Sequence, residues 1–402
     1  MPLQPFTGSF TQQEPIAEEA IAAAVDVMRS GRLHRYNVAG EELPPASVLE
    51  KAFADYQGAR FCLACASGGY AMQLSLRAAD LQAGEPILTN AFTLAPVPGA
   101  IAAVGGKPVL VESSADLTID LQDLWEKAKA SNARFLMLSH MRGHICDMDR
   151  LADILDQTGL TLIEDCAHTM GARWRGRMSG SFGLAGCFST QTYKHINSGE
   201  GGLITSDDPL FMARAILLSG SYMLYERHGA APERSVFDGL RLETPNCSGR
   251  MDNLRAAILV KQIEALDGSV ARWNERYRML EAGLDQSVVM QVPKRPSEED
   301  FVGSSIQFLI AGITATEATR FLADAKSLGV EVKWFGAADP VAFTSNHHSW
   351  AYLEDQDLPK TDAVLSGLFD LRIPLTFSVE DCRHIAEILV SCADRLYQRG
   401  VA

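Results

Sequence analysis

Three side chains that can do chemistry together lie within residues 161–205. A short apolar run, Leu162-Ile163, leads into Asp165, a second apolar run closes at Ser189, and Lys194 follows shortly after it. A lysine amine can hold an aldehyde as a Schiff base, a carboxylate can keep a pyridine nitrogen protonated, and a hydroxyl can bind a phosphate. A lone Asp or Lys is more often a cap or a solvated charge, but this combination predicts a site for pyridoxal phosphate.

The same stretch carries longer motifs around these side chains. They are Glu164-Asp165-Cys-Ala-His168, Gly180-Ser-Phe-Gly183, Cys187-Phe-Ser189, and Lys194 followed by Gly199-Glu-Gly-Gly202. They resemble the DegT/DnrJ/StrS family of sugar aminotransferases, and the likeness covers most of the chain. The resemblance implies an α/β fold of the aspartate aminotransferase-like type, which is fold type I of the pyridoxal phosphate transferases.

The resemblance also assigns roles to the residues of the motifs. It makes Lys194 the Schiff-base lysine, pairs Asp165 with the pyridine nitrogen, places His168 near the ring oxygen of the cofactor, and gives Ser189 to its phosphate. It implies glutamate or glutamine as the amino donor and a keto or aldehyde sugar as the acceptor. That acceptor is nucleotide-linked in much of the family, and a free keto-acid sugar in one subgroup.

A second phosphate-binding element is expected earlier in the chain. Residues 61–66 predict a strand, Ser67-Gly68-Gly69 a turn, and residues 70–81 a helix. A glycine turn at a helix start offers free N–H groups and a positive dipole end, which suit a phosphate. The family carries a threonine where Gly69 stands, so one hydroxyl is missing here.

Other candidate site residues come from the resemblance alone. Leu94 stands where the family places an aromatic on the cofactor ring, so apolar packing is expected there instead. Asn246 is expected to reach the cofactor phosphate of a partner subunit, which implies a homodimer; a capping or turn role is the alternative. Tyr36, Arg250 and His347 are candidates for substrate binding, although the loop that carries Tyr36 could also be an ordinary one.

Strand and helix patterns alternate through the first part of the chain. Short apolar runs at 86–89, 109–112 and 135–139 are separated by helical patterns, which predicts a mostly parallel central sheet covered by helices on both faces. Beyond Pro293 the pattern becomes α+β. The expected ranges there are strands at 306–313 and 330–335 and helices at 316–328, 361–371 and 379–397.

Three parts of the chain are therefore expected. Residues 1–45 form an N-terminal arm and helix, residues 46–251 a large cofactor-binding domain, and residues 252–402 a connecting helix with a smaller α+β C-terminal domain. A chain of 402 residues suits two domains that share a large core.

Composition excludes several classes of protein. The net charge is −14, with 36 basic against 50 acidic residues, which argues against a nucleic-acid-binding protein. The first residues lack the pattern of a secretion signal and no run is long enough to span a bilayer, so no membrane partner is expected and the expected compartment is the cytoplasm. The eight cysteines occur in apolar contexts, which favours buried, reduced thiols.

Two other patterns could indicate different chemistry. Cys62 and Cys65 have CxxC spacing, but they lie in an apolar run without a second pair or a nearby histidine. His140 and His144 are four residues apart, but in a loop, where that spacing does not place them on one face. No metal is therefore expected.

Two alternative functions remain beside the aminotransferase. Some members of the family carry histidine in place of the lysine and act as sugar dehydratases; Lys194 argues against this, although His195 is adjacent. A non-catalytic cofactor-binding regulator is the other alternative, because a fold does not dictate a function. An absorbance that bleaches with glutamate or glutamine would distinguish the aminotransferase from both.

Overall fold

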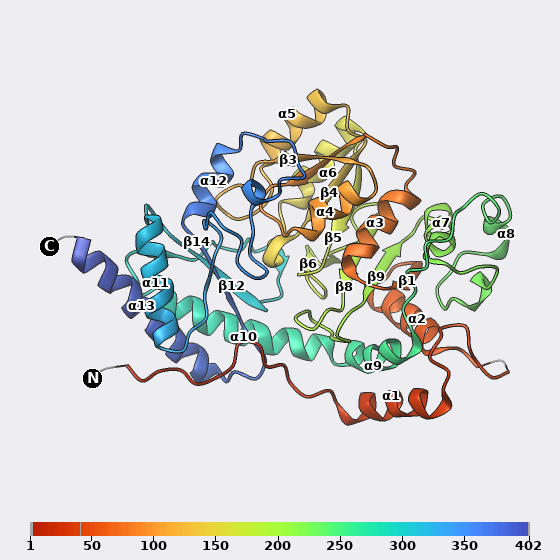
Figure 1. The fold of residues 1–402 in the computed structure, drawn as a ribbon, viewed down its shortest axis with the longest axis horizontal. Coiled ribbons are helices and arrows are strands. Elements are labelled where there is room, and N and C mark those ends of the chain that lie inside the picture. Colours follow the sequence, from red (N-terminus) through yellow and green to blue (C-terminus); the bar gives the residue numbers. More distant parts are fainter. Residues whose placement is uncertain (1–2, 41, 401–402) are drawn as a thin grey trace.

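A seven-stranded sheet forms the centre of the larger part of the molecule (Figure 1). The computed structural model describes residues 3–40 and 42–400. From one edge to the other the strands are β1 (Phe61–Cys65), β9 (Gly202–Ser206), β8 (Ala185–Ser189), β5 (Thr161–Asp165), β4 (Phe135–Ser139), β2 (Pro86–Asn90) and β3 (Lys107–Val111). Only β9 runs against its neighbours, so the sheet is mostly parallel.

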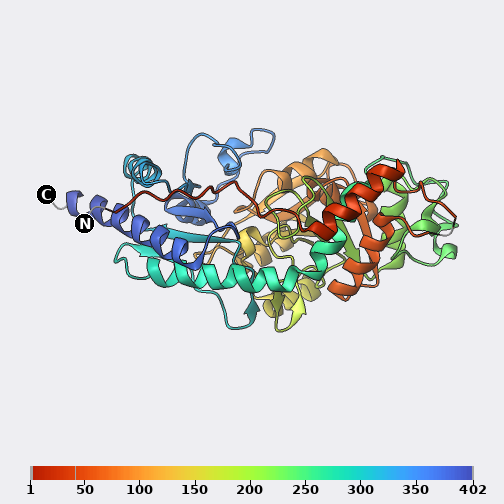
Figure 2. The ribbon, with the colours of Figure 1, turned by 90° about the horizontal axis from the view of Figure 1, so that it is seen from below.

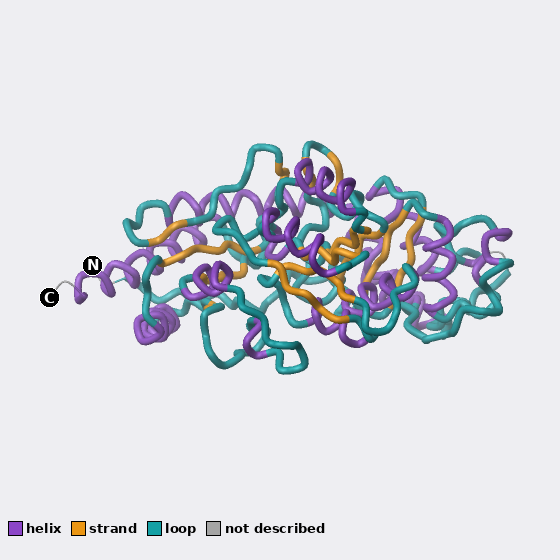
Figure 3. The backbone as a smooth tube through the Cα atoms, turned by 90° about the horizontal axis from the view of Figure 1, so that it is seen from above, coloured by secondary structure: helices purple, strands orange, loops and turns teal. Residues whose placement is uncertain are grey.

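Helices cover both faces of this sheet, as the tube in Figure 3 shows. Successive side chains of a strand point to opposite faces, and in β1 Leu63 packs in one apolar cluster while Cys62 and Ala64 pack in another. On the Leu63 face lie α3 (Gly68–Ala78), α4 (Pro96–Ala103) and α7 (Pro209–Ser219). On the other face lie α2 (Pro45–Gln57), α5 (Leu121–Ser131), α6 (Met148–Thr158) and α9 (Asn253–Glu264).

The smaller part has an antiparallel sheet of four strands. Their order is β10 (Met290–Gln291), β12 (Ser305–Ile310), β14 (Leu368–Arg372) and β13 (Lys333–Trp334). The main helices around it are α10 (Leu266–Leu284), α11 (Ala315–Ser327), α12 (Pro359–Ser366) and α13 (Val379–Gly400). This confirms the expected α/β architecture with a smaller α+β part.

One expected helix in this region is wrong over half its length. The helix predicted for residues 361–371 ends at Ser366, and β14 begins at Leu368. The run Leu368-Phe369 is apolar enough for either structure, and its partner decides between them: Phe369 stacks on Phe308 of β12 with ring centroids 5.5 Å apart. That contact joins distant parts of the sequence and has no local signal.

Two further expectations are corrected in detail. The strand expected at 330–335 shrinks to β13, and the long helix expected from Asp252 is broken at Ala265 between α9 and α10. Helix α9 packs on the central sheet, whereas α10 packs on the smaller part. The division of domains at residue 252 stays a prediction.

The N-terminal arm crosses from the smaller part to the larger one (Figure 2). Phe6 N donates to the Leu328 carbonyl over 2.8 Å, and the rings of Phe6 and Phe10 each lie 4.9 Å from Phe377. The chain then continues into α1 (Glu18–Ser30), which packs on α9. The arm therefore links two regions that are distant in sequence.

Short elements complete the fold. A second link is the sheet of β11 (Glu299–Asp300), β6 (Arg173–Trp174) and β7 (Arg177–Met178), in which β11 pairs with β6. The others are η1 (Met141–Gly143), η2 (Tyr225–Arg227), α8 (Arg234–Phe237) and η3 (His347–Ser349). Over the described ranges, none of the helices combines the length and apolarity needed to cross a membrane.

Candidate active site

A cavity of about 380 Å³ lies where five parallel strands end. Because β1, β2, β4, β5 and β8 run in the same direction, the loops that follow them meet at one edge of the sheet, where α/β proteins bind their ligands. Eight predicted residues line this one cavity: Ser67, Gly68, Gly69, Leu94, Asp165, His168, Ser189 and Lys194.

Lys194 and His168 are in contact on the cavity wall. Lys194 Nζ lies 2.9 Å from His168 Nε2. Burial, with the nearby charge of Arg142, lowers the pKa of Lys194 to about 7 against the opposing effect of Asp165. Burial and the Lys194 charge also hold the pKa of His168 well below its ordinary value. An amine with such a pKa is substantially uncharged near neutral pH, as a nucleophile or base requires.

Asp165 is the buried carboxylate of the cavity. It ends β5 and is only 6% exposed. Its Oδ2 accepts a hydrogen bond from Ser139 Oγ over 2.9 Å, and its Oδ1 accepts one from the Ala167 N–H over 3.1 Å. Two donors fix the orientation of the side chain, and a carboxylate oxygen can accept a further proton donor in the cavity.

The start of α3 forms another wall. The helix begins at Gly68, earlier than the predicted Tyr70, and Ser67 caps it by accepting from the Tyr70 N–H over 3.0 Å. A Cβ on Gly68 would lie 2.8 Å from Ser189 Cβ, so this approach of helix to strand requires glycine. Gly69 has no such crowding, because the nearest atom to its Cβ position is Ser67 Oγ at 4.0 Å.

The chain also matches a known protein family, and the geometry of the cavity agrees with that match. The model of the DegT/DnrJ/EryC1/StrS aminotransferase family matches residues 14–390. The chain belongs to this family. Two related proteins are each 33% identical to it over 224 residues.

The first of these is GDP-perosamine synthase of Caulobacter vibrioides, where the match covers 56% of this chain and 57% of the relative. The second is L-glutamine:scyllo-inosose aminotransferase of Streptomyces griseus, with 55% and 52% covered. The matched segment thus spans little more than half the length of either relative.

Solved aminotransferase structures share the whole fold. One is a putative sugar aminotransferase from Streptococcus pneumoniae in its PMP form, with a TM-score of 0.81 over 98% of this chain and 100% of that one. At 19% identity this likeness shows the fold alone.

Four predicted site residues of this family member lie away from the cavity. Tyr36 is buried, and its hydroxyl lies 2.8 Å from His228 Nε2. Next to it, Glu50 accepts from Arg35 Nη2 over 2.9 Å and contacts His228 Nδ1 at 3.1 Å. Within one chain, Tyr36 therefore belongs to a buried polar network that joins the N-terminal region to the segment after α7.

Of the other three, Asn246 is exposed, Arg250 is half-buried and His347 is buried. Asn246 accepts from the Ser248 N–H over 3.1 Å, and Arg250 Nη1 donates to the Gly220 carbonyl over 2.9 Å. His347 Nε2 lies 2.8 Å from a carboxylate oxygen of Asp362. None of the three lines the cavity of its own chain.

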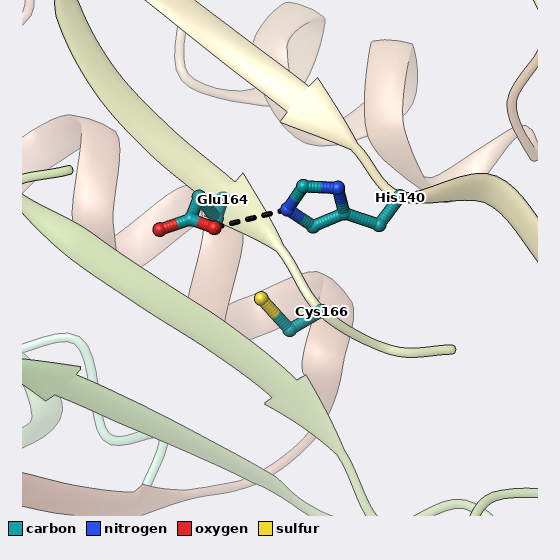
Figure 4. A group of neighbouring side chains, drawn as sticks. All are labelled: His140, Glu164 and Cys166. Carbon is teal, nitrogen blue, oxygen red and sulfur yellow. Dashed lines mark hydrogen bonds and ion pairs between the residues drawn. The ribbon is translucent and has the colours of Figure 1, made fainter. Parts of the chain in front are cut away.

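A buried group beside the cavity has the composition of a metal site (Figure 4). His140 Nε2 lies 2.9 Å from Glu164 Oε2, and Cys166 is adjacent. The Glu164 carboxylate also accepts from the N–H groups of Gly180 and Phe182, over 3.0 and 2.7 Å. Burial raises the pKa of the Cys166 thiol well above its ordinary value. These hydrogen bonds give Glu164 a structural role.

The CxxC pair and the two histidines of the loop after β4 also have structural roles. Cys62 and Cys65 are buried in β1, and burial raises the pKa of the Cys65 thiol to about 12, which makes it a poor nucleophile. His144 Nε2 lies 2.8 Å from Gln307 Oε1 of β12, so it points toward the smaller part and does not pair with His140.

Sequence reasoning missed three basic residues of the cavity: Arg142, Lys333 and Arg372. Arg142 lies between His140 and His144 in the loop after β4. Because that loop follows a parallel strand, its place at the ligand-binding edge of the sheet could have indicated Arg142 as a site residue. Lys333 and Arg372 lie on short strands whose pairing is not visible in the sequence.

Proposed function

We propose that the protein is a pyridoxal phosphate-dependent aminotransferase that moves an amino group from L-glutamate or L-glutamine to a keto or aldehyde sugar. One observation carries the proposal: an amine with a pKa near 7 and a buried carboxylate, Lys194 and Asp165, share a cavity with a helix start suited to a phosphate. Membership of the family and the names of both relatives support amino transfer to a sugar-like acceptor.

The residues present fit the cofactor. Lys194 would hold the aldehyde, Asp165 the pyridine nitrogen, and the N–H groups at the start of α3 with Ser189 would hold the phosphate. Leu94 lines the cavity and offers an apolar contact for the ring. When bound, the cofactor supplies an electron sink that makes loss of a proton from the donor carbon possible.

The residues of the chain then move and hold protons. The amine of Lys194 takes the proton from the α-carbon of the amino donor, and in the second half-reaction it gives a proton to the carbon that carried the sugar carbonyl. The Asp165 carboxylate would accept a hydrogen bond from the pyridine nitrogen of the bound cofactor and stabilise positive charge there. His168, uncharged and 2.9 Å from Lys194 Nζ, can accept a hydrogen bond from the protonated amine. Because the amino donor and the sugar acceptor use the same cavity in turn, ping-pong kinetics are expected.

We further propose that the enzyme is a homodimer with shared active sites. Asn246 and Arg250 do not line the cavity of their own chain, which supports a role toward a partner. The nearby segment exposes Tyr222 by 57%, Met223 by 51% and Leu242 by 83%, and apolar surface of this kind favours a protein interface. A cytoplasmic location is part of the proposal, and eight free cysteines suit a reducing compartment.

Absorbance spectroscopy with product analysis tests the proposal. The purified holoenzyme should show a visible band that bleaches on addition of L-glutamate or L-glutamine, and a keto sugar should restore it with formation of the amino sugar. Loss of water from a sugar without any amino donor would indicate the dehydratase instead. His195 offers little for that reaction, because its Nε2 lies 3.1 Å from Ser304 Oγ and burial lowers its pKa to about 3. A band that no amino donor bleaches would favour the regulator.

A further inference from the structure

The missed basic residues gather on one side of the cavity. Arg142 belongs to η1, Lys333 to β13 and Arg372 to β14. Lys333 lies opposite Asp370 in the register of the two strands, and Arg372 follows two residues later on the same face of β14. Thus two cations from the smaller part meet one from the larger part.

Asp370 is the carboxylate that they share. It is fully buried, and its Oδ2 lies 3.0 Å from Arg142 Nη2 and 3.5 Å from Lys333 Nζ. Its Oδ1 accepts from Gln307 Nε2 over 2.8 Å. Three cations against this single carboxylate leave two positive charges unbalanced.

The remaining acidic residues of the cavity do not supply this balance. Asp165 is held by Ser139 Oγ and the Ala167 N–H and is assigned to the cofactor nitrogen. Glu200 is an exposed residue whose charge is solvated. Burial lowers the pKa of Lys333 to about 8 even though Asp370 opposes this. Burial also lowers the pKa of Arg372, and repulsion from Arg142 contributes. The cluster is therefore short of negative charge.

Two structural features hold the cluster in position. Arg142 adopts the left-handed conformation, with φ 55° and ψ 22°, which is uncommon for a residue other than glycine. Its Nε is buried and has no hydrogen-bond partner. The guanidinium of Arg372 stacks on Tyr193, with Cζ 3.6 Å from the ring centre, and Tyr193 is the chain neighbour of Lys194.

We infer that Arg142, Lys333 and Arg372 form a carboxylate-binding subsite, and that the sugar acceptor is an acid, a keto or aldehyde sugar with a carboxylate of its own. This rests on the proposed function. Planar guanidinium groups match a carboxylate with paired hydrogen bonds. Since donor and acceptor use the cavity in turn, a neutral sugar would leave two partly buried charges without a counterion in one half-reaction, at a cost in binding.

A nucleotide is one alternative occupant of the cavity. At about 380 Å³ the cavity of one chain is near the lower end for a ligand site, and the bound cofactor would occupy part of it. The carboxylate of the amino donor is a second source of the same chemistry. Both alternatives are arms of the test.

The test compares matched probes on the holoenzyme by titration calorimetry, which does not require turnover. D-Glucuronate and D-glucose differ in a carboxylate on the sugar, and L-glutamate and L-isoglutamine differ in the α-carboxylate of the donor; UDP represents a nucleotide. The variants are Lys333→Gln and Arg372→Gln, with Lys333→Arg as the conservative change. Arg320→Gln, an exposed arginine of α11, is the control.

Wild type is expected to bind D-glucuronate at least about 10-fold more tightly than D-glucose, and each Gln variant to reduce that preference by about 10-fold. Lys333→Arg and Arg320→Gln should keep it. A loss of preference that affects only the amino donor overturns the acid acceptor, and tighter, cluster-dependent binding of UDP overturns the carboxylate assignment. If no probe depends on Lys333 or Arg372, the subsite itself is refuted. Failure of every amino donor to bleach the visible band would refute the proposed function, separately from these binding results.

Discussion

Replacement of Asp165 by asparagine should separate catalysis from folding. The change keeps the shape of a side chain that is 6% exposed. The amide oxygen can still accept from the Ala167 N–H, and the Ser139 hydroxyl can turn to accept from the amide nitrogen, so the fold should persist. What is lost is the negative charge opposite the pyridine nitrogen of the bound cofactor.

The size of the effect follows from the loss of one partner of a buried ion pair, which costs about 3 kcal/mol or more. Since about 1.4 kcal/mol is a factor of ten in rate, bleaching of the visible band by L-glutamate should slow by about 100-fold or more in single-turnover measurements. Ser139→Ala is the matched control. It removes one hydrogen bond to Asp165 and keeps the charge, so a loss of about 1 kcal/mol, or roughly 5-fold, is expected.

Two results would refute this reasoning. Asp165→Asn with a bleaching rate within a few-fold of wild type would show that the charge does not act on the cofactor. Equal losses of cofactor binding and thermal stability, without a separate loss of rate, would make Asp165 a structural carboxylate.

Three other perturbations test the site and the fold. Burial raises the pKa of Glu50, but Arg35 and His228 outweigh it and lower that pKa from 4.5 to about 2, so about 3 kcal/mol of stability should be present above pH 4.5 and be lost as the pH falls toward 2. Glu50→Gln should lower the free energy of unfolding by a similar amount in urea at pH 7, whereas Glu264→Gln, at an exposed position, should change it little. Equal urea midpoints for the wild type and Glu50→Gln would contradict the expected loss of about 3 kcal/mol. With a Lys194 pKa near 7, the rate of cofactor attachment to the apoprotein should level off near pH 8, and a rise that continues to pH 10 would show an ordinary lysine. Mixed Lys194→Ala and Asn246→Ala subunits should recover part of the activity that neither has alone, because one site of the mixed dimer keeps both residues; a monomer that turns over would exclude this.

Site residues whose places depend on local sequence patterns could be predicted from the sequence. Asp165 and Ser189 end short apolar runs, and the ends of parallel strands meet at one edge of a sheet. The sequence alone therefore predicted that these two residues and Lys194 share one site. Ser67 and Gly68 were found for the same reason. The glycine turn after an apolar run predicts a helix start.

What the sequence missed depends on pairing between distant segments. Phe369 was assigned to a helix because its strand exists only beside Phe308. Lys333 and Arg372 are single charges in short runs, and they become neighbours only when β13 pairs with β14. Asn246 lies outside the cavity of its own chain, so its expected role depends on a second subunit, which no pattern in one sequence can position.

Locating the cofactor on the chain tests the central claim most directly. Borohydride reduction of the holoenzyme, followed by peptide mass spectrometry, should find the pyridoxyl group on Lys194 and on no other lysine. Addition of L-glutamate or L-glutamine before reduction should prevent the labelling, because the donor releases the lysine. Labelling of Lys333 instead, or labelling of Lys194 that neither donor prevents, would contradict the account.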